Sequence, residues 1–98
     1  MIKGILTKDN PVSKEFSFEG TVNILLVGGM GELTIERSVM DSEFYPLSTD
    51  ISGGQAVLTL DGDCAYNGTL EEKGLQTKYR FRAELTSGEV EYIITRPK

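Results

Sequence analysis

Apolar and polar residues alternate along much of this chain, so that every second side chain is hydrophobic. The alternation runs through residues 16–19, 22–26, 33–36, 79–85 and 90–94, and residues 57–60 add a short β-rich run. A period of two is typical of a β-strand that buries one face. Glycines separate these stretches, as turn residues do. The pattern therefore predicts an all-β chain.

Two segments depart from the alternation. Pro46 lacks a backbone donor, so residues 44–47 are expected to form an edge strand or a loop. Residues 69–73 have a helical composition, but Gly74 would stop a helix after barely a turn, so a loop is expected. Residues 1–98 are long enough for one core. We predict a single antiparallel β-sandwich of about seven strands, Ig-like or jelly-roll in topology, with Greek-key connections.

Two turns are expected to close hairpins, one at residues 28–31 and one at Ser87-Gly88. In each case the register that matches apolar residues across the pair depends on the turn length. The matched pairs would be Leu26 with Leu33, Ile24 with Ile35, Leu85 with Val90, Ala83 with Tyr92 and Phe81 with Ile94.

The first of these turns also contains the start of a nucleotide-binding pattern, because an apolar strand enters Gly28-Gly29-Met30-Gly31. A dinucleotide loop needs a third glycine, which would fall at Thr34, and a helix after it. Here an alternating strand follows, and Glu32 places a negative charge where phosphate would sit. No Gly-Lys-Ser/Thr follows either. The glycines therefore predict a turn and not a phosphate site.

Little in the composition points to catalysis. The chain has no histidine and a single cysteine, Cys64, so the Ser/His and Cys/His dyads and cysteine metal clusters are missing. The carboxylate pairs Glu71/Glu72 and Glu89/Glu91 have no neighbours in sequence that would separate their pKa values, as acid–base catalysis requires. We predict no catalytic residue and a protein that is not an enzyme.

A calcium site is also not expected. Asp61-Gly62-Asp63 begins like a calcium loop, and Glu72 falls at the twelfth position. However, Ala65 occupies a ligand position and Tyr66 stands where the loop needs glycine. We predict a turn there, and no metal or cofactor.

The net charge of −5 is spread over both halves of the chain, which argues against a nucleic-acid partner. The longest apolar stretch, residues 24–30, is far below the roughly 20 residues that span a bilayer. No secretory signal is visible, so synthesis in a cytoplasm is expected. Lys78, Arg80 and Arg82 form a basic ridge, which either docks an acidic partner or, as we favour, pairs with Glu84, Glu89 and Glu91.

Association is better supported than catalysis. Residues 22–27 are apolar on both faces, so either another segment or another subunit must cover the second face. Residues 1–13 form either an arm that adds to a partner's sheet or an ordinary first strand. The interface candidates are Ile2, Ile5, Leu6, Leu25, Val27, Met30, Phe44 and Tyr45.

The sequence GTVNILLVGGMGELTIERSVMDSEFYPL, followed later by KYRFRAELTSGEVEYIITR, resembles small all-β virion proteins of tailed bacteriophages. In those proteins a strand like Glu36-Arg37-Ser38 leads through an acidic turn like Asp41-Ser42-Glu43 to an aromatic and proline segment. A closing Tyr-x-x-Arg before Ser-Gly is matched by Tyr79, Arg82, Ser87 and Gly88. The chain has Glu43-Phe44-Tyr45 and no tryptophan where those proteins carry a glycine-rich, tryptophan-containing turn.

The resemblance implies a structural role in a virion assembled in the host cytoplasm. The expected function is capsid decoration, with repetitive binding to the major capsid protein or another virion protein, and a homo-oligomer, dimer or trimer, would fit such a lattice. The alternatives are a head-to-tail or tail-fibre fitting, a carbohydrate-binding β-sandwich, and, more weakly supported, a small hydrolase.

Overall fold

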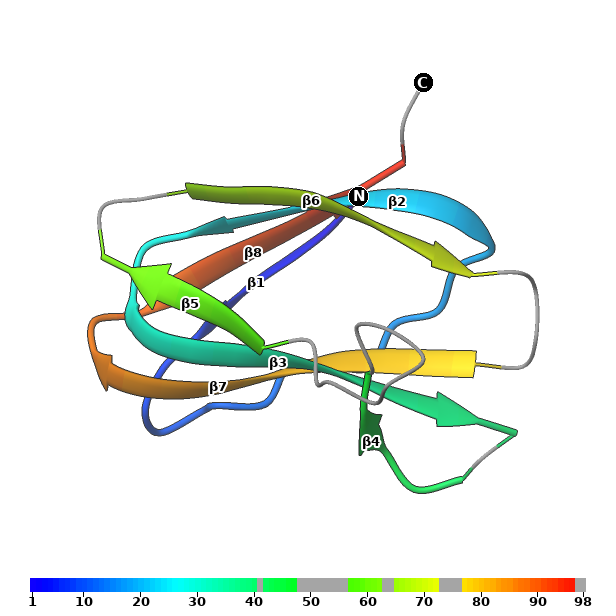
Figure 1. The fold of residues 1–98 in the computed structure, drawn as a ribbon, viewed down its shortest axis with the longest axis horizontal. Helices are drawn as coiled ribbons and strands as arrows, with labels where there is room; N and C mark the ends of the chain where they lie inside the picture. The colour runs from blue at the N-terminus through cyan, green and yellow to red at the C-terminus, as the bar shows by residue number, and fades with distance from the viewer. Residues whose placement is uncertain (41, 48–56, 63–64, 73–76, 97–98) are drawn as a thin grey trace.

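The computed structural model describes residues 1–40, 42–47, 57–62, 65–72 and 77–96, which form two antiparallel sheets (Figure 1). The strands are β1 (Ile2–Leu6), β2 (Gly20–Val27), β3 (Met30–Val39), β4 (Tyr45–Pro46), β5 (Val57–Asp61), β6 (Ala65–Glu72), β7 (Thr77–Ser87) and β8 (Val90–Thr95). Sheet A has the order β1-β8-β2-β6. In sheet B, β3 pairs with β7 on one side and with β5 and β4 on the other. The described residues contain no helix, and the all-β prediction is confirmed.

One hydrophobic core is built from the facing sides of the two sheets. Alternating residues of the strands point inward as their periodicity predicts, and those that form the core are at most 7 % exposed. Phe18 and Leu85 are only partly buried, and the strand expected from the alternation at residues 16–19 is wrong, because Phe16 there forms only a single bridge. Sheet A contributes Leu6, Val22, Ile24, Leu26, Val90, Tyr92 and Ile94, and sheet B contributes Leu33, Ile35, Leu60, Tyr79, Phe81 and Ala83. The rings of Phe81 and Tyr92 meet edge to face across the core, with centroids 5.3 Å apart. Such aromatic pairs add to the stabilisation that comes from buried apolar area.

Both predicted hairpins are wrong. β2 pairs with β6 and β8, whereas β3 pairs with β4, β5 and β7, so the chain changes sheets at Gly28-Gly29. It changes sheets again between β7 and β8, at Gly88. The residues of each expected apolar match therefore lie in opposite sheets and are not neighbours in one sheet. Alternation fixes which face is buried but not which strand lies alongside, and a second sheet satisfies the same pattern.

The outer edge of β7 is covered by the segment that links β1 to β2. Single bridges join Val12 to Arg82 and Phe16 to Tyr79. The backbone amides of Phe16 and Tyr79 each donate to the other's carbonyl, at 2.9 and 2.8 Å, and Ala83 donates to the carbonyl of Pro11. These bonds protect the edge of sheet B, which would otherwise present unpaired backbone groups.

Two local predictions had opposite outcomes. Tyr45–Pro46 forms the two-residue edge strand β4, as Pro46 requires. The loop expected at residues 69–73 is wrong for 69–72, which belong to β6. Pairing with β2 overrides the weak helical preference there, because a sheet partner supplies hydrogen bonds along the whole segment. Lys73, Asp63 and Cys64 lie outside the described residues.

A bulge shapes the pairing of β3 with β7. The register shifts between Met30 and Gly31, so that Thr86 is the extra residue, and the Thr86 hydroxyl donates to the Met30 carbonyl at 3.1 Å. Gly31 has φ 140°, and a Cβ there would collide with the Glu84 carbonyl oxygen and lie 2.9 Å from the Cα of Leu85. Glycine is therefore required at this crossing of the backbones.

Replacing Gly31 with alanine is expected to destabilise the fold by about 3 kcal/mol, because a strained backbone and a steric clash add together. Gly20→Ala is the matched control, since Gly20 also has a positive φ but has no atom within 4 Å of an added Cβ. That control should cost about 1 kcal/mol. Urea unfolding of both variants measures the difference, and equal losses would contradict the proposed clash.

Candidate interaction surface

Four apolar side chains lie together on the outer face of sheet A. Residues opposite to the buried ones in each strand face outward, and the register brings Ile5, Leu25, Val27 and Ile93 into adjacent rows. Ile93 stands between Lys3 and Leu25, and Glu91 stands between Ile5 and Val27. We call Ile5, Leu25, Val27 and Ile93 the outer patch.

The outer patch is open to solvent in part. Ile5 is 53 % exposed and Val27 is 39 % exposed, while Leu25 and Ile93 are half-buried. The remaining outward positions of β2 and β8 are polar, among them Thr21, Asn23 and Thr95. An apolar group within a polar rim is the usual composition of an interaction site. The sequence predicts that either another segment of the chain or another subunit covers the second face of β2. No described segment of this chain covers it.

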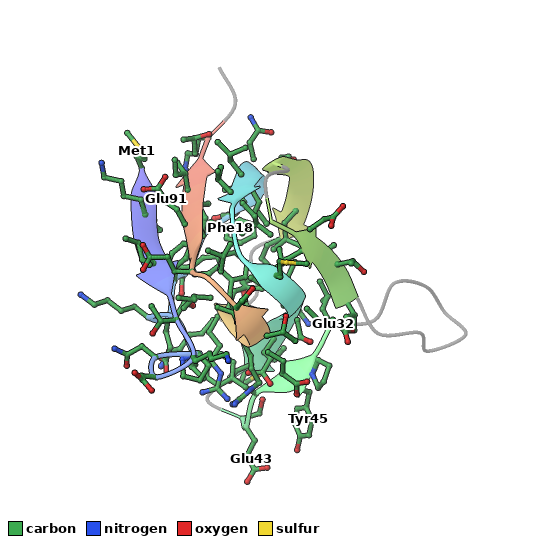
Figure 2. All side chains as sticks on the ribbon, turned by 90° about the vertical axis from the view of Figure 1, so that its left-hand side faces the viewer. Met1, Phe18, Glu32, Glu43, Tyr45 and Glu91 are labelled. Carbon is green, nitrogen blue, oxygen red and sulfur yellow. The ribbon has the colours of Figure 1, made fainter. Side chains whose placement is uncertain are left out.

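The other interface candidates lie elsewhere. Leu6 is a core residue at 1 % exposure, so its side chain is not at the surface. Ile2 is 40 % exposed at the start of β1. Residues 2–6 pair with β8 of the same chain, which matches the expectation of an ordinary first strand and not that of an arm. Met30 is 46 % exposed at the start of β3. Figure 2 shows Tyr45 projecting far from Met1, and Tyr45 is 59 % exposed.

Phe44 is engaged within the chain, because its ring packs on the Arg80 guanidinium, 4.2 Å from Cζ to the centroid. Arg80 Nε also donates to Glu36 at 2.7 Å, and Arg82 Nε donates to the other oxygen of Glu36 at 3.2 Å. The basic ridge thus pairs internally as favoured, but the predicted partners were wrong for these two arginines. The reason is that Glu36 lies on the neighbouring strand, directly opposite Arg80.

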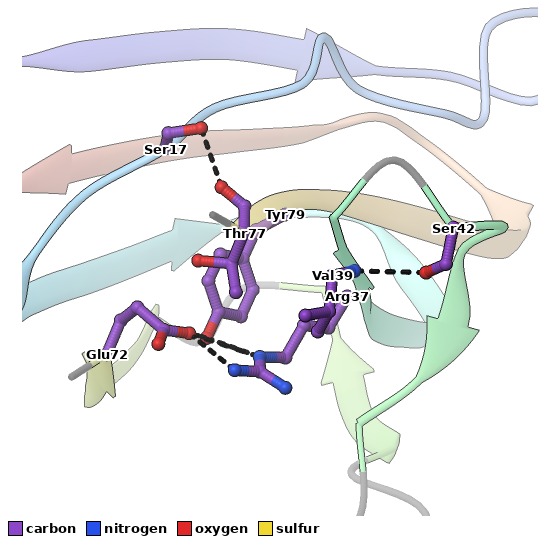
Figure 3. A network of polar contacts seen from close by, with 7 residues as sticks. All are labelled: Ser17, Arg37, Val39, Ser42, Glu72, Thr77 and Tyr79. Atoms are coloured by element: carbon purple, nitrogen blue, oxygen red, sulfur yellow. Dashed lines mark hydrogen bonds and ion pairs between the residues drawn. The ribbon is translucent and has the colours of Figure 1, made fainter. Parts of the chain in front are cut away.

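A second polar cluster closes one margin of the core (Figure 3). Arg37 of β3 donates from Nε and Nη2 to Glu72 Oε1 of β6, at 3.1 and 2.9 Å, and so links the two sheets. The Tyr79 hydroxyl donates to the same carboxylate oxygen at 2.5 Å and accepts from Arg37 Nε at 3.1 Å. The Glu72 side chain is 3 % exposed. A carboxylate buried to this extent needs such donors to remain ionised.

The contacts determine the protonation states of this cluster. Burial alone would raise the pKa of Glu72, but the hydrogen bonds from Tyr79 and Arg37 outweigh burial and lower that pKa. Burial and the neighbouring Glu72 carboxylate raise the pKa of Tyr79 to about 12. The lowered pKa of Glu72 contributes stability above its ordinary pKa of 4.5, and this contribution is lost as pH falls below it. An ionised carboxylate that is paired with Arg37 is a structural ion pair and not a poised acid or base.

Sequence reasoning missed the residues that organise these sites. Ile93 completes the outer patch, and Glu36 and Arg37 bind partners on β7 and β6. The pattern carries one signal: Glu36 and Arg37 are adjacent charged residues inside a strand, so one of them must face the core and needs a partner. Which partner it has depends on the sheet order.

Among the described residues, no group of three or more acidic or cysteine side chains is placed to hold a metal ion. The same residues include no helix long and apolar enough to cross a membrane. Comparison with protein-family models, with curated proteins and with solved structures gave no match.

Replacing Arg37 with methionine is expected to destabilise the protein by about 3 kcal/mol, because Glu72 is left buried without its cation. The double variant Arg37→Met/Glu72→Leu should lose less than the single variant, since it removes the uncompensated charge. Urea unfolding at neutral pH measures both. A double variant that loses as much stability as Arg37→Met, or more, would show that the ion pair does not couple the sheets.

Tyr79 should ionise about two pH units later than an ordinary tyrosine. Its raised pKa contributes stability that is complete below pH 10 and is lost as pH rises toward 12. An ultraviolet titration of tyrosinate absorbance should show a late step that Tyr79→Phe removes. Tyr45→Phe, at the exposed β4 position, is the control and should leave that step unchanged.

Proposed function

We propose that this chain is a non-enzymatic structural protein that docks through the outer patch onto a larger protein assembly. The observation that carries the proposal is the patch itself: four apolar side chains on adjacent rows of sheet A, with Lys3 and Glu91 among them. Burying such a cluster is favourable by about 25 cal/mol for each Å² of apolar area. The assembly we propose, on the resemblance of residues 20–96 to small phage virion proteins, is the capsid of a tailed bacteriophage.

The two outer faces support the choice of surface. On sheet B, the outward-facing Glu36 already binds Arg80 and Arg82, and Phe44 covers Arg80. On sheet A, the outward positions near the centre carry the outer patch around Glu91, and no segment among the described residues covers them. A partner therefore gains more buried apolar area on sheet A, while sheet B offers groups that already have partners.

The proposal also covers the topology of the two sheets and the oligomeric state of the protein. We infer that the two sheets form a β-sandwich of the Ig-like or jelly-roll kind, and that the protein acts as a dimer or trimer on a symmetric lattice. A rigid module that presents one small patch binds weakly by itself. Many copies on a repetitive surface make such contacts sufficient, because multivalency raises the effective concentration.

The test is co-sedimentation with capsids specified by the genome that encodes this chain, titrated to saturation. Binding should level off at a fixed copy number for each particle. Leu25→Lys/Val27→Lys is expected to weaken binding by about tenfold or more, since each buried lysine charge costs over 1 kcal/mol.

Thr59→Lys is the matched control, because Thr59 is exposed on β5 and faces away from sheet A. It should sediment with capsids like the parent protein. Thermal unfolding must show that all variants remain folded. Failure to bind at micromolar concentrations, or equal losses for the two lysine variants, would overturn the proposed docking mode.

A further inference from the structure

β1 is an edge strand of sheet A, and its outer edge is unpaired among the described residues, whereas the outer edge of β7 in sheet B is covered. β1 pairs with β8 on one side, and no described strand pairs with its other side (Figure 2). The opposing edge, on β7, is instead covered by residues 11–16. About half of the backbone amides and carbonyls of β1 therefore point away from the sheet and can accept another strand.

Two hollows border β1 on the side that faces the segment of residues 10–18. One, of about 360 Å³, lies between Lys3–Leu6 and the segment that contains Val12 and Lys14. The other, of about 210 Å³, lies at the start of β1 and is lined by Ile2, Phe16, Phe18 and Ile94, among others. Side chains of an added strand would alternate between these hollows and solvent.

Gly4 shapes the larger hollow. A Cβ at this position would collide with the Tyr92 hydroxyl and lie 2.6 Å from Cζ, so the tyrosine ring reaches the hollow only because residue 4 is glycine. No described residue forms a hydrogen bond with that hydroxyl. It is a ready donor or acceptor beside the unpaired backbone of β1.

Charge indicates what kind of strand would bind. Lys3 and Lys14 both line the larger hollow, and neither forms an ion pair with the described residues. A second copy would add another Lys3 and Lys14 to the same opening, which disfavours self-association through β1.

We propose that β1 is a strand-addition site for an extended, acidic segment of another protein. The added strand pairs with the backbone of residues 2–6, places apolar side chains over the two hollows, and sets carboxylates beside Lys3 and Lys14. This contact uses the edge of β1, whereas the outer patch lies on the outer face of sheet A, and the two surfaces meet at Lys3 and Ile5. The proposal does not depend on the proposed capsid role.

The test uses two synthetic peptides of about ten residues, the length of a long strand. In one, glutamate alternates with valine and threonine; in the other, lysine replaces glutamate. Addition of the glutamate peptide to isotope-labelled protein should shift the amide resonances of residues 2–6 and 12–14 and slow hydrogen exchange in β1. The lysine peptide should bind about tenfold more weakly, as expected for the loss of two ion pairs and their replacement by repulsion.

The charge-reversed variant Lys3→Glu/Lys14→Glu should invert the order of the two peptides, which a loss of folding cannot mimic. Lys8→Glu, in the neighbouring loop outside the lined hollow, is the matched control and should preserve the order. Leu25→Lys/Val27→Lys should bind the glutamate peptide like the parent, so failure of this site and failure of the outer patch are distinguishable. Equal binding of both peptides, shifts confined to other strands, or no shift at millimolar peptide would overturn the proposal.

Discussion

The packing of Phe81 against Tyr92 is the contact on which the arrangement of the two sheets depends. The rings belong to consecutive strands, β7 and β8, that lie in different sheets, and they meet at the centre of the core. Phe16 extends the contact, with its centroid 5.3 Å from Phe81 and 5.9 Å from Tyr79. Because apolar burial is the dominant favourable contribution to folding, the orientation of every other strand follows from turning its apolar face toward these rings.

The same constraint explains why charged residues gather where they do. Arg37 and Glu72 lie on core-facing positions, at the margin where the aromatic rings end, and they satisfy each other with the help of Tyr79. Glu36, one residue earlier than Arg37, faces outward and binds two arginines of β7. The outer face of sheet B around Glu36 is thereby polar and internally paired, whereas sheet A carries the outer patch and the free edge of β1.

Sequence periodicity was sufficient to predict most strands, their buried faces and the edge position of Pro46, because these depend on local alternation and on one missing donor. It failed at residues 16–19, which alternate but form only a single bridge, and at residues 69–72, which belong to β6. Sheet order was not predictable in the same way, since Leu26 satisfies the alternation equally well beside Leu33 or across a core from it. The outer patch could be predicted in part from the sequence. Leu25 and Val27 stand out in an apolar run, whereas Ile93 joins them only when β8 is placed beside β2. The ion pairs could not be predicted from the sequence, because each joins residues that only the order of strands in the sheets brings together.

The position of β8 between β1 and β2 has a consequence for how the protein is made. Ile2 pairs with Ile94, so the first strand has no neighbour in its sheet until residues 90–95 have been synthesised. Contacts between residues so far apart in sequence are slow to form, because a long loop must close before any contact rewards it. Until then, the apolar faces of β1 and β2 have no strand between them. Sheet A therefore cannot be completed before β8 has been made, and the net charge of −5 opposes association of the unfinished chain in the meantime.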